Sequence, residues 1–342
     1  MLQKYCIKNG HIKSYIYIIL FVLPLICSLF SLCIGRIYLH PLQVIQAFIN
    51  FIQQQKIDPI ISSILFNIRL PRILTALIIG AGLSAAGLSF QAIFANPLAT
   101  PDILGVSSAA SLGAIIAIIL NVDTLGIQLI AMCFGLIAIF ITLKIGRLQG
   151  KSSIIMLVLS GLIVSSLANA FSSLLKYTAD PSNKLPAISY WLMGSFARSS
   201  YNNIIIAGFF IVISVLFIVF SSFKLNIMSL SEDEAKSLGL NVQRYRVYFI
   251  LASTLITASA ISICGQVGWI GLIIPHLARM IIGSNNVYAL PVGIFFGSAF
   301  MVIIEALSRT ISVIELPISI LTAILGAPIF IVLLKRTGGI LK

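Results

Sequence analysis

Long apolar runs, separated by short polar segments, recur along nearly the whole chain. A helix needs about 20 apolar residues to cross the ~30 Å hydrocarbon core of a bilayer, and most of these runs approach that length. The runs that we predict to be membrane spans lie at 14–34, 72–92, 103–121, 125–144, 153–175, 203–222, 246–264, 269–283, 289–308 and 316–334. The pattern predicts an all-α polytopic membrane protein with about ten transmembrane helices.

The first apolar run follows a basic segment that contains Lys4, Lys8 and Lys13, as a secretory signal peptide does. Its apolar core is longer than an ordinary signal core, and no small-residue cleavage site clearly follows it. We therefore expect 14–34 to be a retained span. Lys and Arg accumulate on cytoplasmic loops, and their distribution favours both termini inside.

Two polar segments are too long to be simple turns. The segment 176–202 is expected outside and is amphipathic, whereas 223–246 is expected inside and contains three consecutive acids. Within the second segment, Ser231 followed by Glu234 predicts a capping box that opens a short helix. Gly239 then stands where such a helix would end.

The composition agrees with a membrane domain, because 59% of the residues are hydrophobic and only 9% are charged. The net charge of +13 does not indicate nucleic-acid binding, since the Lys and Arg residues are spread over short loops without interleaved aromatic residues. The five cysteines form neither a CxxC motif nor a cluster with histidine, so neither a disulfide framework nor a metal site is expected. We expect one membrane domain over 1–342.

No motif for ATP hydrolysis is convincing. The segment 146–152, GRLQGKS, resembles a phosphate-binding loop, but it has one residue too few between its glycines and no preceding strand. If transport uses ATP, another chain must hydrolyse it. We also expect no enzymatic activity and no cofactor, because no nucleophile–base pair lies at a span end.

Two ionisable residues within or beside the spans have local explanations. Glu305 lies in a span, and Arg309 follows it by one helical turn, which favours an intrahelical ion pair over a proton relay. His276 lies beside Pro275 at a helix end, without a second metal-binding side chain at a suitable spacing. A stand-alone secondary transporter, which would need a coupling-ion site near mid-membrane, is therefore the remote alternative.

Small residues crowd the second and third spans and indicate close helix packing, which is compatible with a translocation pathway. The segment 96–105, NPLATPDILG, joins these spans, and its two prolines disfavour helix. Irregular backbone at membrane depth must be buried in protein or reached by water, so we expect a buried, partly hydrated corner beside the pathway. The residues that we assign to the pathway or its packing are Gly80, Gly87, Gln91, Asn96, Pro97, Gly105, Ser107, Pro275 and His276.

Several stretches, in order along the chain, resemble the FecCD-type permeases, the membrane subunits of ABC importers for iron-siderophore complexes, haem, cobalamin and some oxyanions. They are RLPRILTALIIGAGLSAAGLSFQAIFANPLATPDILGVSSAASLGA (69–114), SYWLMGSF (189–196), SEDEAKSLGLNV (231–242), GQVGWIGLIIPHLARMIIG (265–283) and EALSRTISVIELPISILTAILGAPIFIVLLKR (305–336). The resemblance implies type II ABC importer architecture, with ten helices per subunit and a pathway at the axis of a permease dimer.

The resemblance also implies partners. Two copies of an ABC ATPase would dock on the cytoplasmic segment, through Ser231, Glu232, Glu234, Ala235, Leu238 and Gly239. An extracytoplasmic substrate-binding protein would present acidic residues to three outward-facing arginines, Arg69, Arg72 and Arg309. The second permease would be an identical copy or a paralogue, and membrane lipid would surround the pair.

The function expected from this resemblance is import of an iron-siderophore or haem complex across the cytoplasmic membrane of a bacterium. Cobalamin and molybdate or tungstate are the alternative cargoes, because the same machinery serves all of them. No residue in the chain distinguishes a siderophore from a haem or a corrin. The permease would perform no chemistry and would couple ATPase states to pathway states.

Overall fold

The computed structural model describes residues 7–8, 11–147 and 154–337 of the 342-residue chain. Two short antiparallel strands, β1 (Ile7–Lys8) and β2 (His11–Ile12), precede the helices. The helices are α2 (Ser14–Cys33), α3 (Pro41–Ile52), α4 (Pro59–Ser62), the π-helix η1 (Ser63–Arg69), α5 (Leu70–Ile93), the 3₁₀-helix η2 (Pro101–Leu104), α6 (Val106–Ile119), α7 (Thr124–Ile145), α8 (Ile154–Thr178), α9 (Lys184–Leu192), α10 (Tyr201–Phe220), α11 (Ser222–Met228), α12 (Glu232–Ser237), α13 (Val242–Cys264), α14 (Ile270–Ile282), α15 (Asn286–Thr310) and α16 (Ile318–Thr337). Most of the segment 146–152 lies outside the described residues.

Each predicted span coincides with one helix. These helices are α2, α5, α6, α7, α8, α10, α13, α14, α15 and α16. Seven helical stretches in the described part are long and apolar enough to cross a membrane, and α6, α14 and α16 are shorter apolar helices. The prediction of an all-α protein with about ten membrane helices is confirmed.

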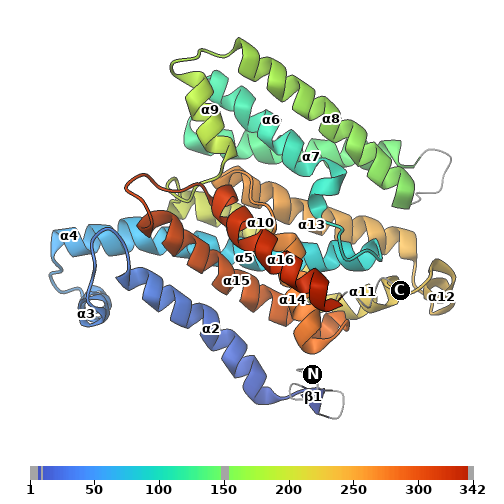
Figure 1. Cartoon of the computed structure of the whole chain (residues 1–342), viewed down its shortest axis with the longest axis horizontal. Helices are drawn as coiled ribbons and strands as arrows, with labels where there is room; N and C mark the ends of the chain where they lie inside the picture. Colours follow the sequence, from blue (N-terminus) through green and yellow to red (C-terminus); the bar gives the residue numbers. More distant parts are fainter. Residues whose placement is uncertain (1–6, 9–10, 148–153, 338–342) are drawn as a thin grey trace.

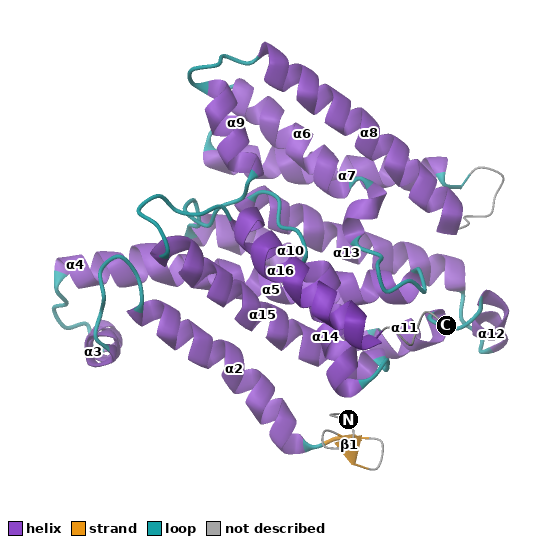
Figure 2. Cartoon of the chain, viewed as in Figure 1, coloured by secondary structure: helices purple, strands orange, loops and turns teal. Residues whose placement is uncertain are grey.

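Helix α5 lies at the centre of the molecule, where it packs against α10, α13, α14 and α15. Helices α6, α7, α8 and α9 lie along one side (Figure 1), and α6 and α7 pack against α13 of the central bundle. Most connecting loops lie near the ends of the helices (Figure 2), as expected when each helix spans the same layer. The loops are therefore presented mainly at the two ends of the bundle.

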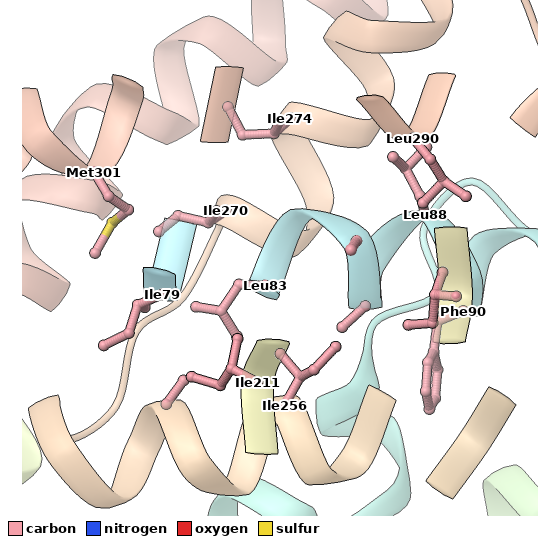
Figure 3. Close-up of a cluster of buried hydrophobic side chains, with 14 of the residues drawn as sticks. Ile79, Leu83, Leu88, Phe90, Ile211, Ile256, Ile270, Ile274, Leu290 and Met301 are labelled. Carbon is pink, nitrogen blue, oxygen red and sulfur yellow. The ribbon is translucent and has the colours of Figure 1, made fainter. Parts of the chain in front are cut away.

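Glycines on α5 allow neighbouring backbones to approach closely. A Cβ atom added at Gly80 would clash with the carbonyl of Gly297 on α15, and one at Gly87 would clash with that of Gly271 on α14. This is the packing role expected for the small residues of the second span. Between these contacts, apolar side chains of α5 meet those of its neighbours (Figure 3). They include Ile79, Leu83, Leu88, Ile211, Ile256, Ile270, Ile274, Leu290 and Met301.

The segment 96–105 forms a corner that is mostly exposed in its first half and mostly buried in its second, where Asp102 stays exposed. Asn96 and Pro97 are exposed, whereas Pro101 is buried and opens η2. Gly105 adopts φ +85° at the start of α6, a left-handed conformation that favours glycine. The expectation of a buried corner is therefore correct only for the second half.

The structure contains more short helices than the sequence predicted. Helix α3 lies within a segment that was expected to be a loop, and its twelve residues are too short for a span. The segment 223–246 contains α12 as predicted, but α11 precedes it.

Candidate functional site

The end of the bundle where α2 and α15 finish and α5 begins contains a cluster of arginines and glutamates, which we call the arginine cluster. Its members are Arg69, Arg72, Arg309, Glu305 and Glu315. We call this end of the molecule the arginine end.

Glu305 of α15 lies at the centre of the arginine cluster and is fully buried. Its Oε1 atom accepts hydrogen bonds from Arg72 Nε at 2.8 Å and from Arg309 Nε at 3.1 Å. Its Oε2 atom accepts from Arg309 Nη2 at 3.1 Å and from Ser31 Oγ at 3.0 Å. The predicted intrahelical pair with Arg309 is confirmed. Because Glu305 also accepts hydrogen bonds from Arg72 and Ser31, it is not an isolated carboxylate of the kind that a proton relay requires.

Glu315, in the loop before α16, forms a second carboxylate contact with Arg72. Arg72 Nη1 is 2.6 Å from Oε1, and Nη2 is 3.1 Å from Oε2. This two-point geometry is the strongest that a guanidinium forms with a carboxylate. Arg72 thereby links two segments near the C-terminal end to the start of α5.

Arg69 and Arg309 also satisfy carbonyl groups at the end of α2. Arg69 Nη1 donates to Leu32 O and Cys33 O, and Arg309 donates to Ser31 O and Ile34 O. The last carbonyls of a helix lack intrahelical donors and carry partial negative charge, so cations stabilise them.

In this conformation the side chains of these three arginines are buried, so they are not presented directly to a partner protein. Arg69, Arg72 and Arg309 are only 2%, 4% and 5% exposed. The physical reason is that two carboxylates of the chain itself and the end of α2 provide their partners. Arg309's pairing with Glu305 could be foreseen from their spacing, but the contacts of Arg72 with Glu315 could not.

Arg36 also lies at this end, and it is exposed. Its guanidinium donates to Val313 O, in the loop that also carries Glu315. Arg36 borders a cavity of about 250 Å³ that opens at the arginine end; the other residues lining the cavity are Ile37, Ile64, Ile68, Arg69, Arg72, Arg309 and Glu315. Four guanidinium groups and one carboxylate line this cavity, which therefore favours anionic groups. Sequence reasoning did not single out Arg36.

At the opposite end of the molecule, α12 projects from the bundle (Figure 1). Ser231 Oγ accepts a hydrogen bond from Glu234 N–H at 3.4 Å, and the Glu234 carboxylate accepts from Ser231 N–H at 3.0 Å. The predicted capping box is confirmed. Gly239 follows α12 with φ +78°, as a helix-ending glycine does. The hydrogen bonds from the Ser231 hydroxyl and N–H lower the pKa of the Glu234 carboxyl below its ordinary value.

The residues of α12 and its end differ in how exposed their side chains are. Ala235 is 1% exposed and anchors the helix against its neighbours, so its predicted position on a docking surface is wrong. Glu232 is half exposed; its Oε1 lies 3.3 Å from Lys236 Nζ, and its Oε2 lies 3.8 Å from Arg246 Nη2 of α13. Leu238 is 61% exposed and gives this surface an apolar side chain. The exposed residues Ser231, Glu232, Glu234, Leu238 and Gly239 are free to meet another protein.

The α12 end is connected to the bundle through asparagines. Asn226 of α11 donates its side-chain N–H to Asn285 Oδ1 at 2.8 Å. Its side-chain oxygen accepts from the backbone N–H of Asn286, the first residue of α15, at 2.7 Å. Direct hydrogen bonds thus join α11 to the start of α15.

The residues assigned to the pathway do not converge on one site. Gln91 of α5 accepts a hydrogen bond from Arg279 Nη1 at 2.7 Å, and Ser107 donates to Asp102. The ring of His276 meets Phe330 of α16 edge-on, with centroids 6.1 Å apart. Pro275 is buried in α14. The glycines Gly80 and Gly87 pack helices together, whereas Asn96 and Pro97 are exposed.

Comparison with known proteins identifies relatives over nearly the full length. The FecCD transport family matches residues 22–336. The chain is 40% identical to the molybdate import system permease MolB of Haemophilus influenzae, covering 93% of this chain and 95% of that protein. It is 36% identical to a permease of Helicobacter pylori named for iron chelatin transport, over 85% of this chain and 88% of that one.

A solved structure, described as an inward-facing conformation of a metal-chelate type ABC transporter, superposes with a TM-score of 0.83 at 38% identity. The superposition covers 94% of this chain and 99% of that one. The fold, the ten helices found at the predicted spans and the sequence similarity agree. The chain belongs to the FecCD transport family of ABC importer permeases.

Proposed function

We propose that this permease carries an iron chelate, either an iron-siderophore complex or haem, across the cytoplasmic membrane. The similarity to a metal-chelate type transporter and to a permease named for iron chelatin supports this cargo. Residues 1–342 would form one membrane domain, with both termini and α12 on the cytoplasmic side. The arginine end would then face outward.

The observation that best supports a transport function is a row of exposed polar side chains along α8, which we call the polar stripe. Ser166, Asn169 and Ser173 are exposed and follow one another at helical spacing. Exposed polar side chains in a membrane helix are costly against lipid and favour a water-filled path or another helix. A second permease, identical or paralogous, would cover this stripe and enclose the path.

Thiol labelling tests the path. A cysteine in place of Asn169 should react with a membrane-impermeant maleimide, whereas one in place of the neighbouring exposed Leu167 should react much less. The parent protein supplies the background from the native cysteines. Equal labelling at the two positions would argue against a pathway along this stripe.

Transport energy would come from a separate ABC ATPase, two copies of which dock at the α12 ends of the permease pair. The exposed Leu238 gives this surface an apolar centre, and Glu232 and Glu234 add charge around it. Replacement of Leu238 by Asp should abolish co-purification of the ATPase. The matched control is Leu238→Met, which keeps an apolar side chain of similar volume and should retain the ATPase.

A substrate-binding protein would dock at the arginine end. The buried side chains of Arg69, Arg72 and Arg309 would hold the segments of this surface in place. The exposed Arg36 would contact an acidic residue of the binding protein. Rim charges of this kind steer association and orientation. Arg36→Glu should weaken stimulation of the ATPase by the binding protein, while Arg36→Lys should largely retain it and both variants should keep basal ATPase activity.

Molybdate is the second candidate cargo, favoured by the 40% identity to a molybdate permease. Uptake into cells with and without this gene would decide, using labelled ferric siderophores, haem, cobalamin and molybdate in parallel. Selective loss of a ferric siderophore or haem supports the proposal. Selective loss of molybdate or cobalamin would replace the cargo and keep the transport mechanism.

A further inference from the structure

Helix α3 has three different faces along its twelve residues. On the first face, Val44 and Ala47 are buried. The rings of Phe48 and Phe51 lie on the same side and contact Phe66 of η1, with centroid distances of 5.3 and 4.6 Å. This face attaches α3 to the helix that leads into the arginine cluster.

The second face is an apolar stripe without a partner in the described chain. It consists of Leu42, Ile45, Ile49 and Ile52, which are 67%, 54%, 46% and 79% exposed. The third face is polar and consists of Gln43, Gln46 and Asn50, which border a cavity of about 150 Å³ together with Lys56 and Asp58. At 3.6 residues per turn, the three faces lie about 120° apart around the helix.

The orientation of α3 differs from that of the spanning helices. Figure 1 shows α3 along its own axis, whereas α2, α5 and α15 run across the same view. The axis of α3 is therefore roughly perpendicular to them. A helix in this orientation lies parallel to the membrane surface.

Exposed tyrosines place α3 at the level of the membrane–water interface. The hydroxyl of Tyr201, at the start of α10, donates to Phe66 O at 2.6 Å, the residue on which α3 packs. Tyr38 is 64% exposed and precedes α3 by only a few residues. Tyrosine at the ends of membrane helices characteristically lies among the lipid headgroups.

We propose that α3 is an interfacial helix whose apolar stripe inserts between the phospholipids of the leaflet at the arginine end. A helix beside a spanning bundle at this depth contacts protein, hydrocarbon and water, which accounts for its three faces. The last turns of α2, which precede α3, also expose apolar side chains, with Leu29 and Phe30 58% and 64% exposed. The lipid thus fixes the depth of α3 and, through Phe66, that of the start of α5.

Tryptophan substitution tests this contact in lipid nanodiscs. Ile49→Trp places the probe on the apolar stripe, and Gln46→Trp places it on the polar face one turn away. The emission of the parent, with its two native tryptophans, is subtracted. Lipids brominated on the acyl chains should quench most of the added emission of Ile49→Trp and little of that of Gln46→Trp. Aqueous iodide should show the reverse preference.

Quenching of Ile49→Trp by iodide and not by brominated lipid would overturn the proposal, because the stripe would face water. Protection from both quenchers would also overturn it, because another protein surface would then cover the stripe. Ile45→Trp, on the same stripe, repeats the measurement at an independent position. These outcomes concern lipid contact alone and hold whichever cargo the permease carries.

Discussion

The arginine cluster and α12 both gather charged residues, but they use charge in opposite ways. In the arginine cluster, Glu305 is fully buried and accepts four hydrogen bonds from three side chains on two other segments and its own helix. At α12, Glu232 and Lys236 are exposed, and their pairing lies within one short helix. The first region binds the fold together, whereas the second leaves its charges available to a partner.

This difference predicts which substitutions affect stability and which affect assembly. A buried charge that loses its partner is costly, while a surface pair contributes little. Substitutions in the arginine cluster should therefore lower stability, and those at α12 should lower association with the ATPase. The predictions below test this division in order of decreasing effect on stability.

Glu305→Ala should have the largest effect. It leaves Arg72 and Arg309 buried without their shared carboxylate, and breaking such a pair costs about 3–5 kcal/mol. Thermal unfolding in detergent should show a large decrease in midpoint and in folded yield. Asp233→Ala is the control, because the Asp233 side chain is fully exposed. Equal midpoints for the two variants would show that the buried network does not stabilise the protein.

Glu315→Ala should have an intermediate effect, because Arg72 keeps its hydrogen bond to Glu305. Loss of a charged hydrogen-bonding partner costs about 1.5–3 kcal/mol in a partly buried site. The same unfolding assay should give a midpoint between those of the parent and Glu305→Ala. A loss as large as that of Glu305→Ala would mean that the loop before α16, and not Glu305, organises the cluster.

Ser231→Ala should destabilise α12 by about 1 kcal/mol through loss of its N-cap. The effect should be confined to α12 and should appear as faster hydrogen exchange of its amides, with little change in the global unfolding midpoint. Ser231→Asp keeps an N-cap acceptor and should restore much of the protection. Unchanged exchange in Ser231→Ala would indicate that docking on α11 and α13, not the cap, maintains α12.

Acidification should loosen α12 through Glu234. Its pKa is lowered in the folded state, so its contribution to stability is present above the ordinary pKa of glutamate and is lost as the pH falls through the lowered value. Amide protection in α12, corrected for intrinsic exchange rates, should therefore decrease at acidic pH. Glu234→Gln should remove this pH dependence; if the dependence persists, another group causes it.

Lys236→Ala should have the smallest effect on stability, below about 0.5 kcal/mol, because its ion pairs are exposed. The unfolding midpoint should be unchanged within error. Recovery of the ATPase with the permease should still respond, because the substitution changes the charge of the proposed docking surface. A clear stability loss without a change in ATPase recovery would contradict the expectation that the charges of α12 act in assembly and not in stability.

The features that sequence could predict depend on residues that are close along the chain. The Ser231–Glu234 box and the Glu305–Arg309 pair are three and four residues apart, so helical geometry alone brings them together. The contact between Arg72 and Glu315 spans 243 positions and exists only because three segments meet at the arginine end. The sequence shows the charges there but not which of them neutralise one another.

Short helices were also difficult to predict. Helix α3 is too short for a hydropathy window tuned to spans, although its apolar and polar positions repeat with helical period. Ala235 matches the motif of a docking segment, yet its burial follows from how α12 packs on α11 and α13. Which face a short helix turns outward is decided by its neighbours, and its own sequence leaves this open.

The glycine contacts of α5 have a practical consequence for distance measurements. At Gly80 and Gly297, α5 and α15 meet backbone to backbone, so no side chain can change rotamer to let one helix slide past the other. Spin labels placed on these two helices should keep a constant separation through every stage of ATP turnover. The distance between these two helices then serves as a constant reference, against which changes in the distances to α8, α12 and α16 can be compared.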